Sequence, residues 1–155
     1  MSAAVITGQV VVFKLDAQRF ALPLDQVERA TRSVAITPLP HAPAVIAGVV
    51  DVRGSVIPVI DIRKRLGLPG RAPTLNDQLL IAGTSKRRYA ALVDTILDVL
   101  VYAPGDFSVA EHVVPGLEFL KGIVRLSDGI VLIHDFEQFL SLEEERALDE
   151  VLRNA

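Results

Sequence analysis

The stretch GVVDVRGSVIPVID, residues 48–61, decides the fold of this 155-residue chain. It is apolar almost throughout, and its branched aliphatic residues favour β-strands. A single Arg-Gly step, Arg53 and Gly54, interrupts it where one short strand turns into the next. The stretch therefore predicts a hairpin of Val49–Val52 and Ser55–Ile60 with an arginine at its tip.

This hairpin has a second copy later in the chain. Residues 122–142, GIVRLSDGIVLIHDFEQFLSL, align with residues 48–68, GVVDVRGSVIPVIDIRKRLGL. The preceding segments 11–27 and 80–96 also align. Two aligned blocks in the same order indicate an internal duplication.

Each half is predicted to contain two hairpins, and the second hairpins are apolar on both faces. Closing each half into a small barrel, with one barrel packed on the other, leaves no bare edge and buries both faces. The three further hairpins are predicted at Val10–Leu15 with Arg19–Leu24, Leu79–Ala82 with Arg88–Val93, and Ile123–Leu126 with Gly129–Ile133.

Short helices are predicted at IRKRL and FEQFL, where Asp61 and Asp135 occupy N-cap positions. A longer helix is predicted over residues 141–153, because Ser141 and Glu144 have the spacing of a capping box. Its apolar stripe is expected to cover the second barrel.

The composition excludes several classes of protein. The formal charge of −3 is too small and too mixed for nucleic acid to be the main partner. Without cysteine, the chain has no disulfide or thiolate metal site. The N-terminus has no basic region of a secretory signal, and the longest apolar run is far shorter than the ~20 residues of a membrane helix. We expect a soluble intracellular protein.

The chain carries no recognisable catalytic or metal-binding pattern. The histidines, His41, His112 and His134, lie in separate segments without metal-type spacing, and no HExxH, GxSxG, P-loop or dinucleotide glycine pattern occurs. Catalytic residues, metal ligands and cofactors are therefore not predicted, and an enzyme is not expected.

A basic cluster follows the first copy of the second hairpin. Its members are predicted to lie on the outer face of a short helix and the loop after it. The cluster consists of Arg63, Lys64, Arg65 and Arg71.

Arg53 has two interpretations. It is a turn cation that points into water, or it is the anchor of a protein interface, with its planar fork ready for a carboxylate. Asp51 lies two residues away on the same strand face and is expected to hold the guanidinium in position.

Residues 37–68 resemble the signature region of the CheW family, the adaptor proteins of bacterial chemosensory arrays. That region includes the pattern G-V-x-N-L-R-G-x-V-I-P-V-x-D-L, which GVVDVRGSVIPVIDI matches at most positions. The resemblance extends to VFKLDAQRFALPLDQVERA, ALVDTILDVL and LKGIV, and covers roughly residues 9–140.

The resemblance implies a mainly β fold of two SH3-like, five-stranded β-barrels that share a core, with short helices and a C-terminal helix. It implies a single CheW-like domain over residues 9–150, with barrel subdomains at approximately 9–70 and 75–140, and strand exchange between them is left open. The C-terminal helix at 141–153 follows.

The function implied by the resemblance is that of a non-catalytic, cytoplasmic adaptor without a cofactor. Its partners would be the regulatory domain of the histidine kinase CheA and the cytoplasmic tip of methyl-accepting chemoreceptors, with no nucleic acid and no membrane insertion. The alternative is a double β-barrel that binds a small ligand or nucleic acid.

The receptor-contact positions of the family fall on Val27, Gly48 and Arg53, with Asp51 beside them. Two residues depart from the family pattern: Asp51 replaces an asparagine, and Arg29 replaces an acidic residue that pairs with the motif arginine. Asp51 or Glu28 would then have to supply that carboxylate. The predicted partner-binding residues are Val27, Gly48, Asp51 and Arg53.

Overall fold

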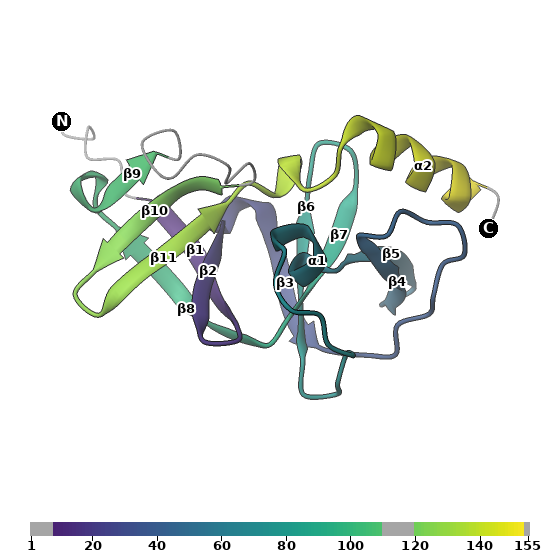
Figure 1. The fold of residues 1–155 in the computed structure, drawn as a ribbon, viewed down its shortest axis with the longest axis horizontal. Coiled ribbons are helices and arrows are strands. Elements are labelled where there is room, and N and C mark those ends of the chain that lie inside the picture. Colours follow the sequence, from purple (N-terminus) through teal and green to yellow (C-terminus); the bar gives the residue numbers. More distant parts are fainter. Residues whose placement is uncertain (1–7, 110–119, 154–155) are drawn as a thin grey trace.

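The computed structural model describes residues 8–109 and 120–153, which form two β-sheets and a C-terminal helix (Figure 1). The six-stranded sheet has the order β8-β1-β2-β11-β10-β9, and the five-stranded sheet has the order β3-β6-β7-β5-β4. One sheet thus has the five expected strands, and the other has a sixth, the three-residue β9. The strands are β1 Gly8–Leu15, β2 Gln18–Pro23, β3 Val27–Arg32, β4 Ile46–Val52, β5 Ser55–Ile60, β6 Gln78–Gly83, β7 Arg88–Val93, β8 Thr95–Tyr102, β9 Phe107–Val109, β10 Leu120–Leu126 and β11 Gly129–His134. The helices are α1 Ile62–Leu66 and α2 Leu142–Arg153, with single 3₁₀ turns η2 Leu24–Gln26, η3 Pro104–Asp106 and η5 Phe136–Gln138.

The internal duplication is visible in the backbone pairing. All four predicted hairpins form, as β1–β2, β4–β5, β6–β7 and β10–β11. The register of β4 against β5 shifts between Ile46 and Gly48, and that of β10 against β11 shifts between Leu120 and Gly122. A bulge at the same aligned position in both copies indicates that the two halves have the same local architecture.

The two sheets combine strands from both halves of the chain. The β5 strand of the first half runs parallel to β7 of the second, with Val59 opposite Ala90. The β11 strand of the second half runs parallel to β2 of the first, with Ile133 opposite Ala21. Each second hairpin therefore pairs with the first hairpin of the other half. The prediction that each half closes into its own barrel is wrong, because each sheet is completed by strands exchanged between the halves.

Both faces of the central strands are buried. Val10 and Val12 of β1 belong to a cluster inside the six-stranded sheet, whereas Phe13 and its apolar neighbours on the opposite face belong to a larger cluster. In β6, Leu79 faces a cluster inside the five-stranded sheet, and Leu80 faces the same larger cluster. Because successive side chains point to opposite faces of a strand, the two sheets share this larger cluster as a common core, as predicted.

The predicted N-caps of both short helical segments are present. Asp61 Oδ1 accepts a hydrogen bond from the Lys64 N–H at 3.2 Å before α1. Asp135 Oδ1 accepts one from the Glu137 N–H at 3.1 Å, but the segment after it forms the 3₁₀ turn η5 rather than an α-helix.

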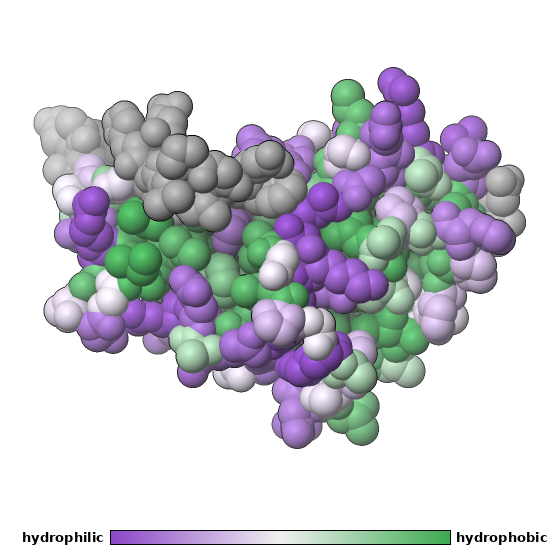
Figure 2. All heavy atoms as spheres, in the orientation of Figure 1, coloured by the Kyte–Doolittle hydropathy of each residue, from purple (hydrophilic) through white to green (hydrophobic). Residues whose placement is uncertain are grey.

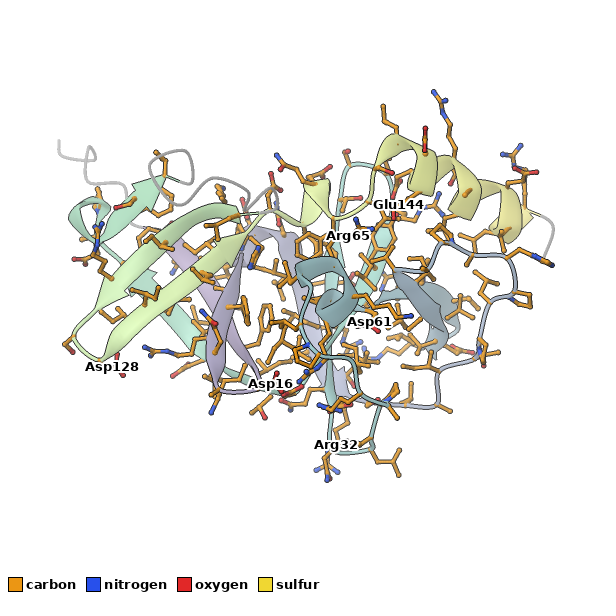
Figure 3. The ribbon with its side chains drawn as sticks, in the orientation of Figure 1. Asp16, Arg32, Asp61, Arg65, Asp128 and Glu144 are labelled. Atoms are coloured by element: carbon orange, nitrogen blue, oxygen red, sulfur yellow. The ribbon has the colours of Figure 1, made fainter. Side chains whose placement is uncertain are left out.

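The C-terminal helix begins with the predicted capping box. Ser141 Oγ accepts from the Glu144 N–H at 3.1 Å, and Glu144 Oε1 accepts from the Ser141 N–H at 2.9 Å. Arg65 of α1 donates to Glu144 Oε2 at 2.5 Å (Figure 3), and the Tyr89 hydroxyl of β7 donates to Glu145. Leu148 is buried in the shared core. The helix therefore contacts both halves of the chain rather than the second half alone.

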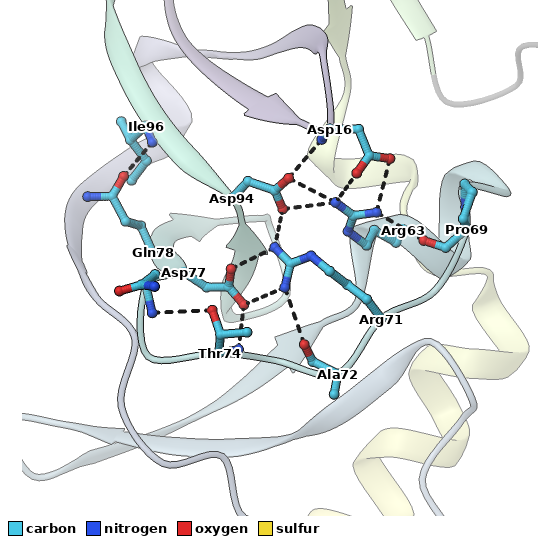
Figure 4. Close-up of polar contacts among 11 residues, drawn as sticks. Asp16, Arg63, Pro69, Arg71, Ala72, Thr74, Asp77, Gln78, Asp94 and Ile96 are labelled. Carbon is cyan, nitrogen blue, oxygen red and sulfur yellow. Dashed lines mark hydrogen bonds and ion pairs between the residues drawn. The ribbon is translucent and has the colours of Figure 1, made fainter.

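A network of ion pairs joins the two sheets at the ends of α1 and β7 (Figure 4). Arg63, whose side chain is only 8% exposed, donates to Asp16 Oδ1 at 2.8 Å and to Asp94 Oδ2 at 2.9 Å. Arg71 donates to Asp94 Oδ1 at 2.6 Å and to Asp77 Oδ1 at 2.7 Å. Asp16 lies in the turn between β1 and β2 of one sheet, and Asp94 lies where β7 of the other sheet leads into β8.

The predicted position of the basic cluster is therefore wrong for Arg63, which is buried, and for Arg65, whose side chain is only 17% exposed. Lys64 and Arg71 are exposed as expected, although Arg71 is also paired with Asp77 and Asp94. Charge patterning along the chain misses these pairs because the partner carboxylates Asp16, Asp94 and Glu144 belong to other elements.

His134 is buried between the rings of Phe20 and Phe139, with ring centroids 5.4 Å and 5.9 Å away. His112 lies outside the described residues. Within the described ranges, no group of three or more His, Asp or Glu side chains is close enough together to hold a metal ion.

The ion-pair network predicts an acid-sensitive fold. Burial alone would raise the pKa of Asp94, but hydrogen bonds from the Asp16 N–H, Arg63 and Arg71 outweigh it, so this pKa lies below its ordinary value. A carboxyl group with a lowered folded-state pKa stabilises the fold above its unfolded pKa of about 3.9. This stabilisation is lost as the pH falls through the folded-state pKa.

We expect Asp94→Asn to lower the free energy of unfolding at pH 7 by about 2 kcal/mol, because it removes the carboxylate that Arg63 and Arg71 share and leaves each with one other carboxylate, Asp16 and Asp77. The decline of stability below about pH 4 should also become shallower. Urea unfolding between pH 7 and pH 2.5 measures both effects. The control is Asp128→Asn, because Asp128 is 72% exposed and its surface pair contributes less than about 1 kcal/mol. An acid transition that is the same in Asp94→Asn as in the unaltered chain would contradict this role of the network.

Candidate functional site

Arg53 and Gly54 form the two-residue turn between β4 and β5, with φ angles of 52° and 85°. Positive φ at both central positions is characteristic of a type I′ turn, for which Asn-Gly is the favoured pair. An arginine at the first position is strained by about 1 kcal/mol, because its Cβ crowds the following carbonyl. Arg53 is therefore not the residue that the turn itself prefers.

The carboxylates expected to pair with Arg53 are engaged elsewhere. Asp51 Oδ1 accepts a hydrogen bond from the Gly54 N–H at 2.8 Å, so Asp51 stabilises the turn rather than the guanidinium. Glu28 accepts from Arg88 through both of its oxygens, at 2.8 Å and 2.9 Å. Arg53 is exposed and makes no hydrogen bond or ion pair with any residue that the structure describes.

Gly48 lies in the strand below this turn and is buried. A Cβ at this position would lie 2.3 Å from the Thr37 carbonyl oxygen and 2.8 Å from Ile36 Cγ2. The glycine is needed because Thr37 and Val49 exchange two backbone hydrogen bonds, of 2.9 Å and 2.8 Å, across it. Gly122, at the aligned position in β10, is crowded in the same way by Phe107 and Ser108.

Val27 begins β3 and is half-buried against the shared core. Val27 and Gly48 therefore shape the backbone near the turn, whereas Arg53 presents its side chain to solvent. Of the four predicted site residues, the structure brings Asp51 and Arg53 together at the turn.

A hollow of about 220 Å³ lies between β3 and β4, the two edge strands of the five-stranded sheet. It is smaller than the roughly 300–1,000 Å³ of typical small-molecule sites, and it has room for a side chain of a protein partner. The sequence did not predict that Thr31 and Val34 belong to this site. They lie beside the turn because the sheet curls and brings its two edge strands together. The hollow is lined by Arg29, Thr31, Val34, Asp51, Val52 and Arg53.

The two copies of the second hairpin differ at their tips. In the β10–β11 copy, Asp128 pairs with Arg19 of β2 at 3.1 Å (Figure 3). In the β4–β5 copy, Gly54 aligns with Asp128, and Arg88, the counterpart of Arg19, is paired with Glu28. The β4–β5 tip therefore lacks the ion pair that holds its counterpart to the sheet.

A second exposed surface lies on the six-stranded sheet. Leu97, Val99 and Val101 alternate along the edge strand β8 and are 45%, 46% and 56% exposed. Ile130 of β11, 45% exposed, lines one groove together with Leu97. We call these four residues the β8 face. Hydrophobic side chains are also visible over the β10–β11 part of this sheet in Figure 2.

The residues of β3 that align with the exposed apolar residues of β8 are mostly charged. When the repeat alignment is continued past Val27, Leu97, Val99 and Val101 correspond to Glu28, Ala30 and Arg32, all of which are exposed. Ile130 corresponds to Val56, which is apolar and 63% exposed. Exposed apolar side chains on an edge strand mark an interaction surface. Two edges with the same backbone thus carry one apolar and one charged surface.

These features define a binding protein with two chemically different surfaces. No helix among the described residues is long and apolar enough to cross a membrane.

Residues 9–144 match the CheW-like domain family. The chain is 26% identical over 141 residues to the chemotaxis protein CheW of Rhizobium meliloti (strain 1021), which covers 90% of this chain and 91% of that protein. It is 27% identical over 146 residues to protein FrzA of Myxococcus xanthus, covering 88% and 87% of the two chains. The crystal structure of the scaffolding protein TtCheW from Thermoanaerobacter tengcongensis superposes with a TM-score of 0.81 at 24% identity, over 90% of this chain and 96% of that one.

The chain therefore belongs to the CheW-like family, whose members are chemotaxis coupling adaptors without catalytic activity. Membership confirms the predicted family, the mainly β fold with two barrel-like sheets, and the expectation of a non-catalytic protein. The alternative of a small-ligand or nucleic-acid-binding barrel is not favoured.

The turn geometry predicts that Arg53 reduces the stability of the free protein. Arg53→Asn should raise the free energy of unfolding by about 0.5–1 kcal/mol, because asparagine is favoured at the first position of a type I′ turn. Arg53→Ala, which keeps the backbone strain, should give no such gain. Urea unfolding of the two variants provides the test, and an Arg53→Asn protein less stable than the unaltered chain would contradict it.

Proposed function

We propose that this protein holds the cytoplasmic tip of a methyl-accepting chemoreceptor and the regulatory domain of the histidine kinase CheA at the same time, within a bacterial chemosensory array. Family membership supports the class of function. The observation that carries the proposal is the pair of unlike exposed surfaces on two sheets that share one core.

The receptor surface in this proposal is the β4–β5 turn and the hollow beside it. Arg53 makes the direct contact, because its guanidinium is exposed and has no partner among the described residues. Asp51 fixes the turn, and Gly48 and Val27 set the path of the strands beneath it. Retaining a strained arginine at the turn is consistent with selection for binding rather than for stability.

The kinase surface in this proposal is the β8 face. The family resemblance implies that the CheA regulatory domain has the same fold and stacks barrel to barrel with the adaptor. Such a contact needs an apolar patch at its centre and tolerates charged residues at its rim. Leu97, Val99, Val101 and Ile130 supply the apolar side chains, since each is between 45% and 56% exposed. The groove that Leu97 shares with Ile130 is also lined by Lys14, Arg19 and Asp128.

Holding both partners on one body lowers the entropic cost of bringing them together, because the second binding event becomes intramolecular. The proposed site of action is the cytoplasm, at the membrane-distal tips of the receptors, without insertion of this chain into the membrane.

The proposal predicts that the two surfaces can be inactivated separately. Arg53→Glu should weaken recruitment to receptor-containing membranes at least about tenfold while leaving capture of the CheA regulatory domain unchanged. Val99→Lys should do the reverse, because a lysine in the apolar contact loses its hydration without gaining a partner. Co-sedimentation and pull-down assays measure the two activities, with circular dichroism as the check on folding. Wild-type recruitment of Arg53→Glu would rule out the receptor surface, and wild-type kinase capture by Val99→Lys would rule out the kinase surface.

A further inference from the structure

The hollow between β3 and β4 brings two cations together. Arg29 of β3 and Arg53 of the turn both line it, and neither makes a hydrogen bond or ion pair with a residue in the described ranges. Asp51 is the single carboxylate in this lining, and its Oδ1 is bonded to the Gly54 N–H. Two like charges therefore face the same small space without compensation by a described residue.

Six arginines elsewhere in the molecule are compensated, whereas the exposed Arg125, Arg146 and Arg153 contact no carboxylate among the described residues. Arg29 and Arg53 differ from these three because both line one hollow. Arg63, Arg65 and Arg71 each contact at least one carboxylate, and so do Arg19, Arg87 and Arg88. Glu28 is adjacent to Arg29 in the chain, but it is on the opposite face of β3 and is paired with Arg88. Arg32, at the end of the same strand, is exposed on the Glu28 face and does not line the hollow.

The lining of the hollow also has an apolar part. Val34 is 43% exposed, and Val52 is half-buried. A partner that fits must therefore present an aliphatic side chain to the two valines and an anionic group to the two guanidinium groups. A carboxylate suits the planar fork of arginine, which it can contact through two parallel hydrogen bonds.

We propose that the receptor segment bound here is an acidic helical surface, in which a Glu or Asp contacts Arg29 and Arg53 and an aliphatic residue one turn away contacts Val34 and Val52. This inference rests on the proposed function and specifies which receptors the adaptor accepts. Receptor tips that carry a lysine or arginine at the contacting position are rejected, because like charges then meet in the interface.

The charge at position 29 controls this choice. An acidic residue there would pair with Arg53 inside the adaptor and leave it less positive charge to offer. The arginine instead increases the positive charge of the hollow. Binding should accordingly depend strongly on ionic strength, since exposed charges are screened by salt.

The test uses purified cytoplasmic tip hairpins of the receptors encoded in the same genome, and measures their dissociation constants at 50 mM and 500 mM NaCl. Arg29→Glu should weaken binding at 50 mM NaCl at least about tenfold and remove most of the salt dependence, and Arg29→Gln should weaken it about threefold. The matched control is Arg125→Glu, which makes the same charge change on an exposed residue of the six-stranded sheet and should bind as the unaltered chain does.

A charge exchange identifies the contacting carboxylate. Acidic residues of the tip hairpin are replaced by lysine one at a time, and one replacement should weaken binding to the unaltered adaptor and restore binding to Arg29→Glu.

The outcomes separate this inference from the proposed function. If Arg53→Glu weakens binding but Arg29→Glu binds as tightly as the unaltered chain, the receptor surface stands and the acidic partner is wrong. If the unaltered adaptor binds none of the tip hairpins, the receptor function fails, and this inference fails with it.

Discussion

Burial of both faces of two sheets around one shared core is the constraint on which the rest of the structure depends. Val10 and Val12 pack inside one sheet, and Leu79 packs inside the other, while Phe13 and Leu80 on the opposite faces of the same strands meet in the common core. Neither sheet can bury its second face alone. The parallel pairing of each second hairpin with the first hairpin of the other half interlocks them. With the core occupied in this way, the edge strands and hairpin tips remain available for partners.

The duplication gives this molecule two copies of one architecture with different surfaces. The bulges, the crowded glycines and the parallel strand pairs recur at aligned positions, so the hairpins and their pairing have the same backbone geometry in both copies. The side chains at the edges differ: β8 is apolar where β3 carries charges, and one hairpin tip is ion-paired where the other presents Arg53. Two sheets of the same type that share one core can therefore serve two different partners.

Features set by neighbouring residues could be predicted from the sequence. The hairpins follow from alternation and turn residues, and the caps at Asp61 and Ser141 follow from helix-start chemistry. The pairing between halves, the sixth strand and the ion pairs of Arg63 could not be predicted, because they depend on residues tens of positions apart. The same limit applies at the site. The position of Arg53 in the turn was predictable, but the hydrogen bond from the Gly54 N–H to Asp51 was not. The placement of Arg29 beside Arg53 depends on the curl of the sheet.

Simultaneous binding tests the central claim, that separate faces of one molecule hold receptor and kinase, most directly. The dissociation constant of a receptor tip hairpin would be measured for the free adaptor and for the adaptor saturated with the CheA regulatory domain, with the mass of the complex determined by light scattering. The account predicts an unchanged dissociation constant and a complex that contains all three components. Displacement of one partner by the other would contradict it, because the two would then share a single surface.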